Sequence, residues 1–435
     1  MRPIFPLTNH AATLLFLPAL VLTVLFGIAQ GVRGDTVGYW VGIVSSATVF
    51  VVLSCTYASL AAALTAGRIR KAQVFKGATT RSPLAIASAG VWPPVVGAII
   101  LQAVGLAMAS SHSWGAPGRI PVEIFAAWIV MILFHTTLGY LFGLLMPAVV
   151  AAPLAVIVSY VWLGFTWSVD YVPLRYLAGL ALSGCCAVYA DLPIEAPLTV
   201  ILFSGGAVAL IAAALALWNH RRRWLMFAGL ASIMIPVTVS SIALASNLGY
   251  YPSPPRATND LVCAEQGDKS VCLFPEQLWN HQGTPTQVVF SALDRLEAQG
   301  IDVPQRVSGA IVPPSADTVW MVYRSDFSNE VTLRSLVSSL VPQRQEGEVC
   351  VRDDEDPDRM FVITDVLRRE LYRLASASDS APDLGEMPTG ADQIDAVTSY
   401  LNRLDEDQRA SWVNNAVTAL RDCEVAYPDT PPLVS

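Results

Sequence analysis

Apolar positions in the first 250 or so residues gather into long uninterrupted runs, whereas apolar and polar positions alternate at short periods in the remainder. A bilayer core is crossed by a helix of about 20 apolar residues. Seven runs reach or approach this length: 11–30, 39–66, 83–110, 121–146, 149–167, 197–218 and 225–248. The fourth and fifth are separated only by a turn at Pro147, so six spans is the alternative count. The pattern predicts a polytopic α-helical transmembrane bundle over residues 1–249.

The short periods of residues 250–435 predict a soluble domain of mixed α/β (α+β) type. Thr284 and Gln287 form a capping box around Pro285, which opens a predicted helix that stops at Gly300. The run "TVWMVY", residues 318–323, is rich in β-branched and aromatic side chains and predicts a strand. Further helices are predicted at 330–340, 359–375, 391–404 and 408–423.

Composition and charge support this division. The chain is 53% hydrophobic and only 14% charged, which is unusual for a soluble domain. Residues 1–250 carry 12 basic and 5 acidic side chains, whereas residues 251–435 carry 15 and 30. The acidic second part argues against a nucleic-acid partner, because phosphate binding needs a basic surface.

Positive charge predicts the orientation, because cytoplasmic loops retain Lys and Arg. The loop after the second run, "RIRKAQVFKGATTR", carries five basic residues: Arg68, Arg70, Lys71, Lys76 and Arg81. The loop after the sixth run carries Arg221, Arg222 and Arg223, which fall on the same side. The five acidic residues of the bundle fall on the other side. The sequence therefore predicts a multi-pass plasma-membrane protein with a retained first span, a cytoplasmic N-terminus and an extracytoplasmic C-terminal domain.

Cysteine usage agrees with an oxidising compartment for that domain. It contains four cysteines, Cys263, Cys272, Cys350 and Cys423, an even number that suits disulfides. Three pairings are open; we favour Cys263 with Cys272, across the turn-prone "QGDK", and Cys350 with Cys423. The alternative is free thiols in a cytoplasmic domain, since a count of six spans reverses the side. Cys55, Cys185 and Cys186 are expected to be small buried hydrophobes.

Two ionisable residues of the fourth run are candidates for function, because such groups are costly in a membrane. His135 lies in mid-run and Glu123 lies at its outer start. The alternative interpretation of His135 is a side chain satisfied by a neighbouring helix.

Between the fifth and sixth runs, the segment "SVDYVPLRYLAGLALSGCCAVYADLPIEAPL" predicts short helices in the outer leaflet. Together with six spans and a basic loop after the second, this segment makes the layout of about the first 220 residues resemble the permease subunit of ABC-2-type exporters. The stretches "VCLFPEQ" and "QRASWVNNAVTALRDC" are similar to segments of actinobacterial membrane proteins of permease type. The seventh run and the acidic domain are additions to the exporter layout.

The resemblance implies a separate cytoplasmic ATPase subunit, a lipid bilayer as surroundings, and a homo- or heterodimer. In that layout the five basic residues after the second run form a coupling loop for the ATPase; the alternative is a lipid anchor on the inner surface. The chain has no G-x-x-x-x-G-K-[ST] phosphate loop, so nucleotide binding of that kind belongs to another chain.

Catalytic and metal motifs are absent from the sequence. It has no H-E-x-x-H and no G-x-S-x-G, and the acidic run at 353–358 lacks the spacing of a calcium loop. We therefore expect no enzyme activity, metal or cofactor. Two alternatives to a permease remain: a membrane-anchored sensor or interaction protein, and a membrane-bound hydrolase that uses Glu276 and His281.

Overall fold

The computed structural model describes residues 10–30, 38–74, 82–216, 223–250, 252–279, 285–312, 315, 317–342, 357–376, 391–422 and 428. The chain divides into two compact units, Met1–Pro255 and Arg256–Ser435. The first unit is built from helices, and the second combines a small mixed sheet with helices.

Six described helices of the first unit are long and apolar enough to cross a membrane: Ala11–Ala29 (α1), Trp40–Lys71, Pro83–Ala109 (α4), Val122–Leu145 (α5), Ala148–Ser168 and Glu195–Ala216 (α8). The second combines α2 (Trp40–Ala47), η2 (Thr48–Phe50) and α3 (Val51–Lys71), and the fifth combines α6 (Ala148–Gly164) and η4 (Thr166–Ser168). Six of the seven predicted spans are thus confirmed as apolar helices of sufficient length.

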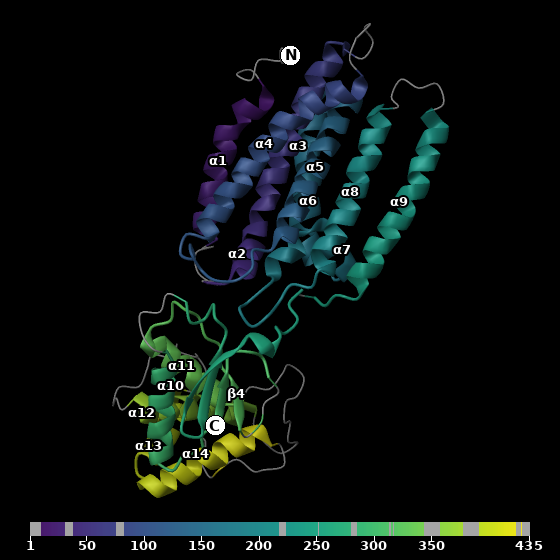
Figure 1. Cartoon of the computed structure of the whole chain (residues 1–435). Coiled ribbons are helices and arrows are strands. Elements are labelled where there is room, and N and C mark those ends of the chain that lie inside the picture. The colour runs from purple at the N-terminus through teal and green to yellow at the C-terminus, as the bar shows by residue number, and fades with distance from the viewer. Residues whose placement is uncertain are drawn as a thin grey trace. The chain divides into compact units, whose positions relative to one another are not determined.

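The seventh predicted span corresponds to α9 (Arg223–Ser246), which lies beside α8 (Figure 1). Its described apolar stretch, Ser232–Ser246, is shorter than the other six. α5 and α6 are separate helices on either side of Pro147, because proline cannot donate the backbone hydrogen bond that would continue α5.

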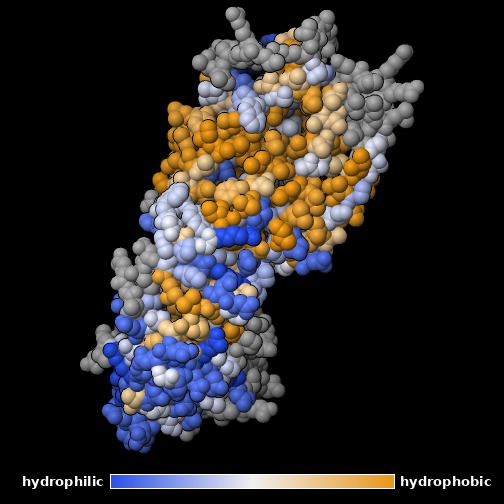
Figure 2. Space-filling model, in the orientation of Figure 1, coloured by the Kyte–Doolittle hydropathy of each residue, from blue (hydrophilic) through white to orange (hydrophobic). Residues whose placement is uncertain are grey.

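The ends of the bundle differ in charge. α1 begins and α3 ends at one end of the bundle, and α9 ends at the other (Figure 1). The basic residues Arg68, Arg70 and Lys71 form the last turn of α3. The described acidic residues, Glu123, Asp170, Asp191 and Glu195, lie in or near the helix starts and loops of the opposite end. The face of the bundle seen in Figure 2 is largely apolar, and many of the large hydrophobic side chains of the described helices are exposed, as a lipid-facing surface requires.

α3 is the central helix and packs against α1, α4, α5 and α6. Its contact with α5 is close because α5 presents Gly139 and Gly143, four positions apart, to α3. A Cβ atom at Gly139 would overlap the backbone oxygen of Ser59, and one at Gly143 would overlap that of Ala63. Small residues at this spacing allow two membrane helices to approach closely.

Between α6 and α8 lie two short helices, α7 (Val172–Ala178) and η5 (Leu180–Gly184), as the sequence predicts. Tyr176 and Leu182 of this segment are buried in the core of the bundle. The chain that follows α9 is tied to the same region, because the Tyr176 hydroxyl donates to the Gly249 carbonyl at 2.8 Å and the Asp191 amide donates to the Pro254 carbonyl at 2.9 Å. The first unit therefore continues to Pro255, past the last helix.

The second unit contains a four-stranded sheet in the order β1 (Val262–Gln266), β2 (Lys269–Leu273), β3 (Arg306–Ser308), β4 (Thr318–Trp320). β1 and β2 form an antiparallel hairpin, whereas β2, β3 and β4 run parallel. The predicted strand at 318–323 is confirmed in its first half. The antiparallel hairpin and the two parallel pairs together make the sheet mixed. The alternation of short apolar runs in the sequence predicts a sheet but not the direction of its strands.

In the described part of the second unit, five α-helices accompany the sheet: α10 (Pro285–Ala298), α11 (Asn329–Leu340), α12 (Pro357–Ser376), α13 (Ala391–Leu401) and α14 (Glu406–Arg421). A short turn, η6 (Thr258–Asp260), precedes β1. α10 ends where the sequence predicts, since Gly300 takes a positive φ of 76° in the turn that follows. The apolar faces of the helices and of β2 and β3 form one core, with Leu293, Val307 and Leu336 fully buried.

Candidate functional site

The basic end of α3 is an exposed cluster of three cations. Arg68, Arg70 and Lys71 are exposed, while Ile69 between them is buried. Cations in the last turn of a helix interact favourably with its dipole. The "RIRK" segment is the continuation of α3, and a turn follows at Ala72. Lys76 and Arg81, the other two residues of the predicted coupling loop, lie outside the described residues.

His135 is buried in mid-bundle and is satisfied by a neighbouring helix. Its Nδ1 atom lies 3.0 Å from the Ser159 hydroxyl of α6, and the residue is 1% exposed. The neighbouring Thr136 and Thr137 donate to carbonyls of their own helix. The alternative interpretation, a histidine held by a packing partner, therefore has direct geometric support.

Glu123 belongs to a different place on the same helix. It lies in the first turn of α5 and forms an ion pair with the exposed Arg119. Twelve residues of helix separate it from His135, which corresponds to about 18 Å along the axis. The structure does not bring these two predicted site residues together.

The favoured disulfide between Cys263 and Cys272 is present. The two residues lie opposite each other in the β1–β2 hairpin, with Cα atoms 3.9 Å apart, and their sulfur atoms are bonded. Cys350 and Cys423 lie outside the described residues. Cys55 is buried and free, as expected. Cys185 and Cys186 are buried as predicted, and their sulfur atoms are within bonding distance of each other.

Glu276, one of the two residues of the hydrolase hypothesis, takes part in a buried ion pair. Both its carboxylate oxygens accept hydrogen bonds from Arg256, each at 3.1 Å. Glu276 is 4% exposed, and the guanidinium of Arg256 also stacks over the ring of Phe274 at 4.3 Å. Its partner in the hypothesis, His281, lies outside the described residues.

Gln277 is a residue whose role the sequence does not reveal. Its side-chain oxygen accepts from the Phe274 amide at 2.8 Å, and its amide donates to the Tyr323 carbonyl at 2.9 Å. It thereby joins the chain after β2 to the chain after β4. The only available signal is its place at the end of "VCLFPEQ", where Phe274, Glu276 and Gln277 are all buried.

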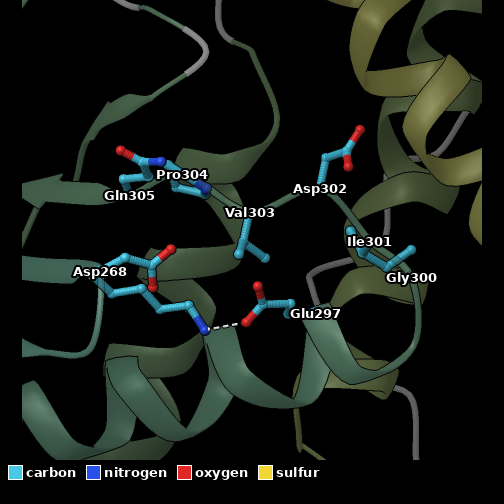
Figure 3. Close-up of a pocket in the computed structure, with 9 residues that line it drawn as sticks. Asp268, Glu297, Gly300, Ile301, Asp302, Val303, Pro304 and Gln305 are labelled. Atoms are coloured by element: carbon cyan, nitrogen blue, oxygen red, sulfur yellow. Dashed lines mark hydrogen bonds and ion pairs between the residues drawn. The ribbon is translucent and has the colours of Figure 1, made fainter.

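A recess of about 300 Å³ lies between the β1–β2 turn, the end of α10 and the segment leading to β3 (Figure 3). It is lined by Asp268, Lys269, Glu297 and residues 300–305. Asp268, from the β1–β2 turn, and Glu297, from α10, face the recess, whereas the carboxylate of Asp302 points away from that of Glu297 (Figure 3).

Lys269 neutralises part of this negative charge. It is 5% exposed, and its Nζ atom lies 2.6 Å from both Asp294 and Glu297. Burial alone lowers the pKa of an ammonium group, but the hydrogen bonds and charges of the two carboxylates outweigh it, so the pKa of Lys269 is raised. Asp268 has no ion pair among the described residues, so the recess as a whole suits a cationic or hydrogen-bond-donating group.

Among the described residues, no group of three or more His, Cys, Asp or Glu side chains is placed to hold a metal ion. In the acidic run at 353–358, residues 353–356 lie outside them, and Asp358 belongs to the first turn of α12.

Comparison with known proteins gives one family match. The family described as "Domain of unknown function (DUF7224)" matches residues 271–423, which lie wholly within the second unit. No curated protein and no solved structure matches the chain.

Proposed function

We propose that this chain is the membrane-spanning, permease-like subunit of an ABC-2-type export or self-protection system, with an outer domain that binds a substrate or partner. The observation that carries the proposal is the exposed cationic end of α3 on an otherwise apolar bundle. Such a charged surface is suited to binding a soluble cytoplasmic subunit. The ATPase is a separate chain, and the resemblance of residues 1–220 to exporter permeases indicates its class.

The proposed orientation places the basic end in the cytoplasm and the second unit outside. It rests on the positive-inside rule, since Arg68, Arg70 and Lys71 occupy one end of the bundle and Glu123, Asp170, Asp191 and Glu195 the other. α9 is the seventh crossing in this arrangement. An odd number of crossings agrees with the start of α1 and the end of α9 at opposite ends of the bundle (Figure 1).

Thiol labelling of intact cells tests this orientation. After mild reduction, a membrane-impermeant maleimide is expected to label Cys263, which is exposed on β1. In the same cells, an Ala72→Cys variant is expected to gain label at position 72 only after lysis, because Ala72 is exposed beside the basic end. The readout is the mass of the labelled peptides.

Two controls make the labelling specific. Cys263→Ser removes the exposed target, and the buried Cys55 stays unlabelled under both conditions. Label on Cys263 only after lysis, together with label on Ala72→Cys in intact cells, reverses the orientation and removes the outer-domain proposal.

Co-purification tests the transport proposal. A mild-detergent pull-down of the full chain from its native host is expected to contain a stoichiometric ATPase. Replacing Arg68, Arg70 and Lys71 together by glutamine removes three exposed charges and is expected to reduce the bound ATPase by about tenfold or more, as in other interfaces steered by charge. The measurement is quantitative mass spectrometry of the eluate.

The matched control is Arg119→Gln, which removes an exposed cation from the other end of the bundle and is expected to leave ATPase recovery unchanged. An ATPase that binds equally to the triple variant would contradict docking at the end of α3. Absence of any ATPase, with secreted or cell-wall proteins in its place, would contradict the transport proposal.

A second function, a membrane-anchored interaction protein without transport, is favoured by one observation. The matched family region, residues 271–423, lies within the second unit and includes none of the bundle, as expected for a binding domain attached to a membrane anchor. In this alternative the recess between Asp268 and Glu297 and the rest of the second unit carry the binding activity, and the bundle serves as the anchor.

A further inference from the structure

Arg175 is a cation buried in the bundle without a conventional partner. It lies on α7 and is 1% exposed. None of its Nε, Nη1 and Nη2 atoms has a hydrogen-bond partner within the described part of the chain. Buried guanidinium groups are ordinarily paired with an acid or hydrogen-bonded to carbonyls. A buried arginine whose side-chain nitrogens have no such partners is therefore unusual.

Two aromatic rings cover the faces of the guanidinium. Its central carbon lies 4.2 Å from the centroid of the Trp167 ring and 3.6 Å from that of the Tyr250 ring. Stacking of this kind uses the flat faces of the cation and leaves the N–H groups in its plane unused. Those five donors form a rigid fork whose geometry matches the oxygens of a phosphate or carboxylate.

The position of Arg175 indicates which anion reaches it. Exposed aromatic side chains surround this part of the bundle at the end of α6 and the start of α7: Tyr160, Phe165 and Tyr171 are each about half exposed. Aromatic residues gather at the level of the lipid headgroups. Arg175 therefore lies at the depth where lipid phosphates are found.

We propose that the Arg175 guanidinium, held between Trp167 and Tyr250, is a binding site for a phosphate group at the membrane surface. Tyr250 covers the site: it is 47% exposed and belongs to the segment after α9 that Gly249 ties to Tyr176. Displacement of the Tyr250 ring uncovers the guanidinium, while Trp167 keeps it in place. The phosphate belongs either to a lipid headgroup or to a soluble phosphate compound. The site needs a membrane-embedded bundle but does not depend on transport or on an ATPase.

Native mass spectrometry of the purified full chain in detergent tests the site. Phosphatidic acid and diacylglycerol with identical acyl chains differ only by the phosphate, so the wild-type chain is expected to retain the first in preference to the second. Arg175→Gln keeps a polar side chain but loses the charge, and is expected to weaken retention of phosphatidic acid by about tenfold or more, as the loss of a charge-assisted hydrogen bond does.

Arg119→Gln is the matched control, because Arg119 is an exposed arginine at the same end of the bundle that already pairs with Glu123. It is expected to retain phosphatidic acid as the wild type does. Inorganic phosphate in the sample identifies the source: displacement of the lipid by phosphate alone assigns a soluble ligand, and its failure to displace assigns the headgroup of a lipid.

The wild-type comparison stands even if Arg175→Gln does not fold. Equal retention of phosphatidic acid and diacylglycerol by the wild-type chain overturns the proposal. Equal loss of phosphatidic acid in the Arg175→Gln and Arg119→Gln variants also overturns it, because the effect would then be one of general surface charge.

Discussion

Replacing Glu276 by alanine is expected to lower the free energy of unfolding of the second unit by about 3 kcal/mol, the lower end of the range for breaking a buried ion pair by removing one member. Arg256 loses two hydrogen bonds of 3.1 Å, whereas its ion pair with the exposed Asp260 at 3.5 Å and its stacking on Phe274 remain. Pulse proteolysis of the full chain in urea, with the fragments of residues 256–435 quantified, measures the change.

Glu330→Ala is the matched control for this prediction. Glu330 is an exposed carboxylate that pairs with Arg334 one helical turn away, and such surface pairs contribute about 0.5 kcal/mol. A loss of similar size in both variants would contradict the buried ion pair. Because Arg256 precedes the matched family region and Glu276 lies within it, the experiment also measures how far the second unit depends on the segment before residue 271.

Replacing Gly139 by alanine is expected to destabilise the bundle by about 3 kcal/mol, near the upper end of the range for overpacked sites. The added methyl group would overlap the backbone oxygen of Ser59. A backbone atom cannot rotate away as a side chain can, so α5 must move away from α3 along its central contact. The thermal unfolding midpoint of the detergent-solubilised chain, followed by thiol exposure of Cys55, is expected to fall.

Gly205→Ala is the control for the bundle. Gly205 also lies within a membrane helix, α8, but the nearest atom to a Cβ there is a Val130 methyl at an ordinary distance of 3.6 Å. This variant is expected to unfold at the wild-type midpoint or slightly above it, since alanine favours the helix more than glycine does. A Gly139→Ala variant as stable as Gly205→Ala would show that the α3–α5 contact tolerates separation.

The candidate site could be predicted from the sequence only where neighbours in the chain determine it. The Cys263–Cys272 pairing is of this kind, because the two cysteines are nine positions apart, and the turn-forming "QGDK" midway between them places them opposite each other in a hairpin. The basic cluster at Arg68, Arg70 and Lys71 is another, since its three charges fall within four positions at one helix end.

Interactions between distant segments could not be predicted in this way. Arg256 and Glu276 are 20 residues apart, and only the return of the chain past β1 and β2 brings them together. The stacking of Arg175 between Trp167 and Tyr250 requires α6, α7 and the end of α9 to meet. In the sequence, Glu276 suggests a catalytic carboxylate and Arg175 is only one of the charges in a polar segment.

The sequence by itself determined the division into an apolar helical part and a polar part, the positions of the apolar helices and the short-range disulfide. These features depend on hydrophobicity and turn propensity, which can be read from residues close together in the chain. Only the tertiary structure decided which buried groups are paired. His135 lies within hydrogen-bond distance of Ser159, and Glu276 accepts hydrogen bonds from Arg256. The side-chain nitrogens of Arg175 have no hydrogen-bond partner among the described residues. The physical reason is that the free energy of a buried polar group depends on the atoms packed against it, and these come from helices and strands far away in the chain.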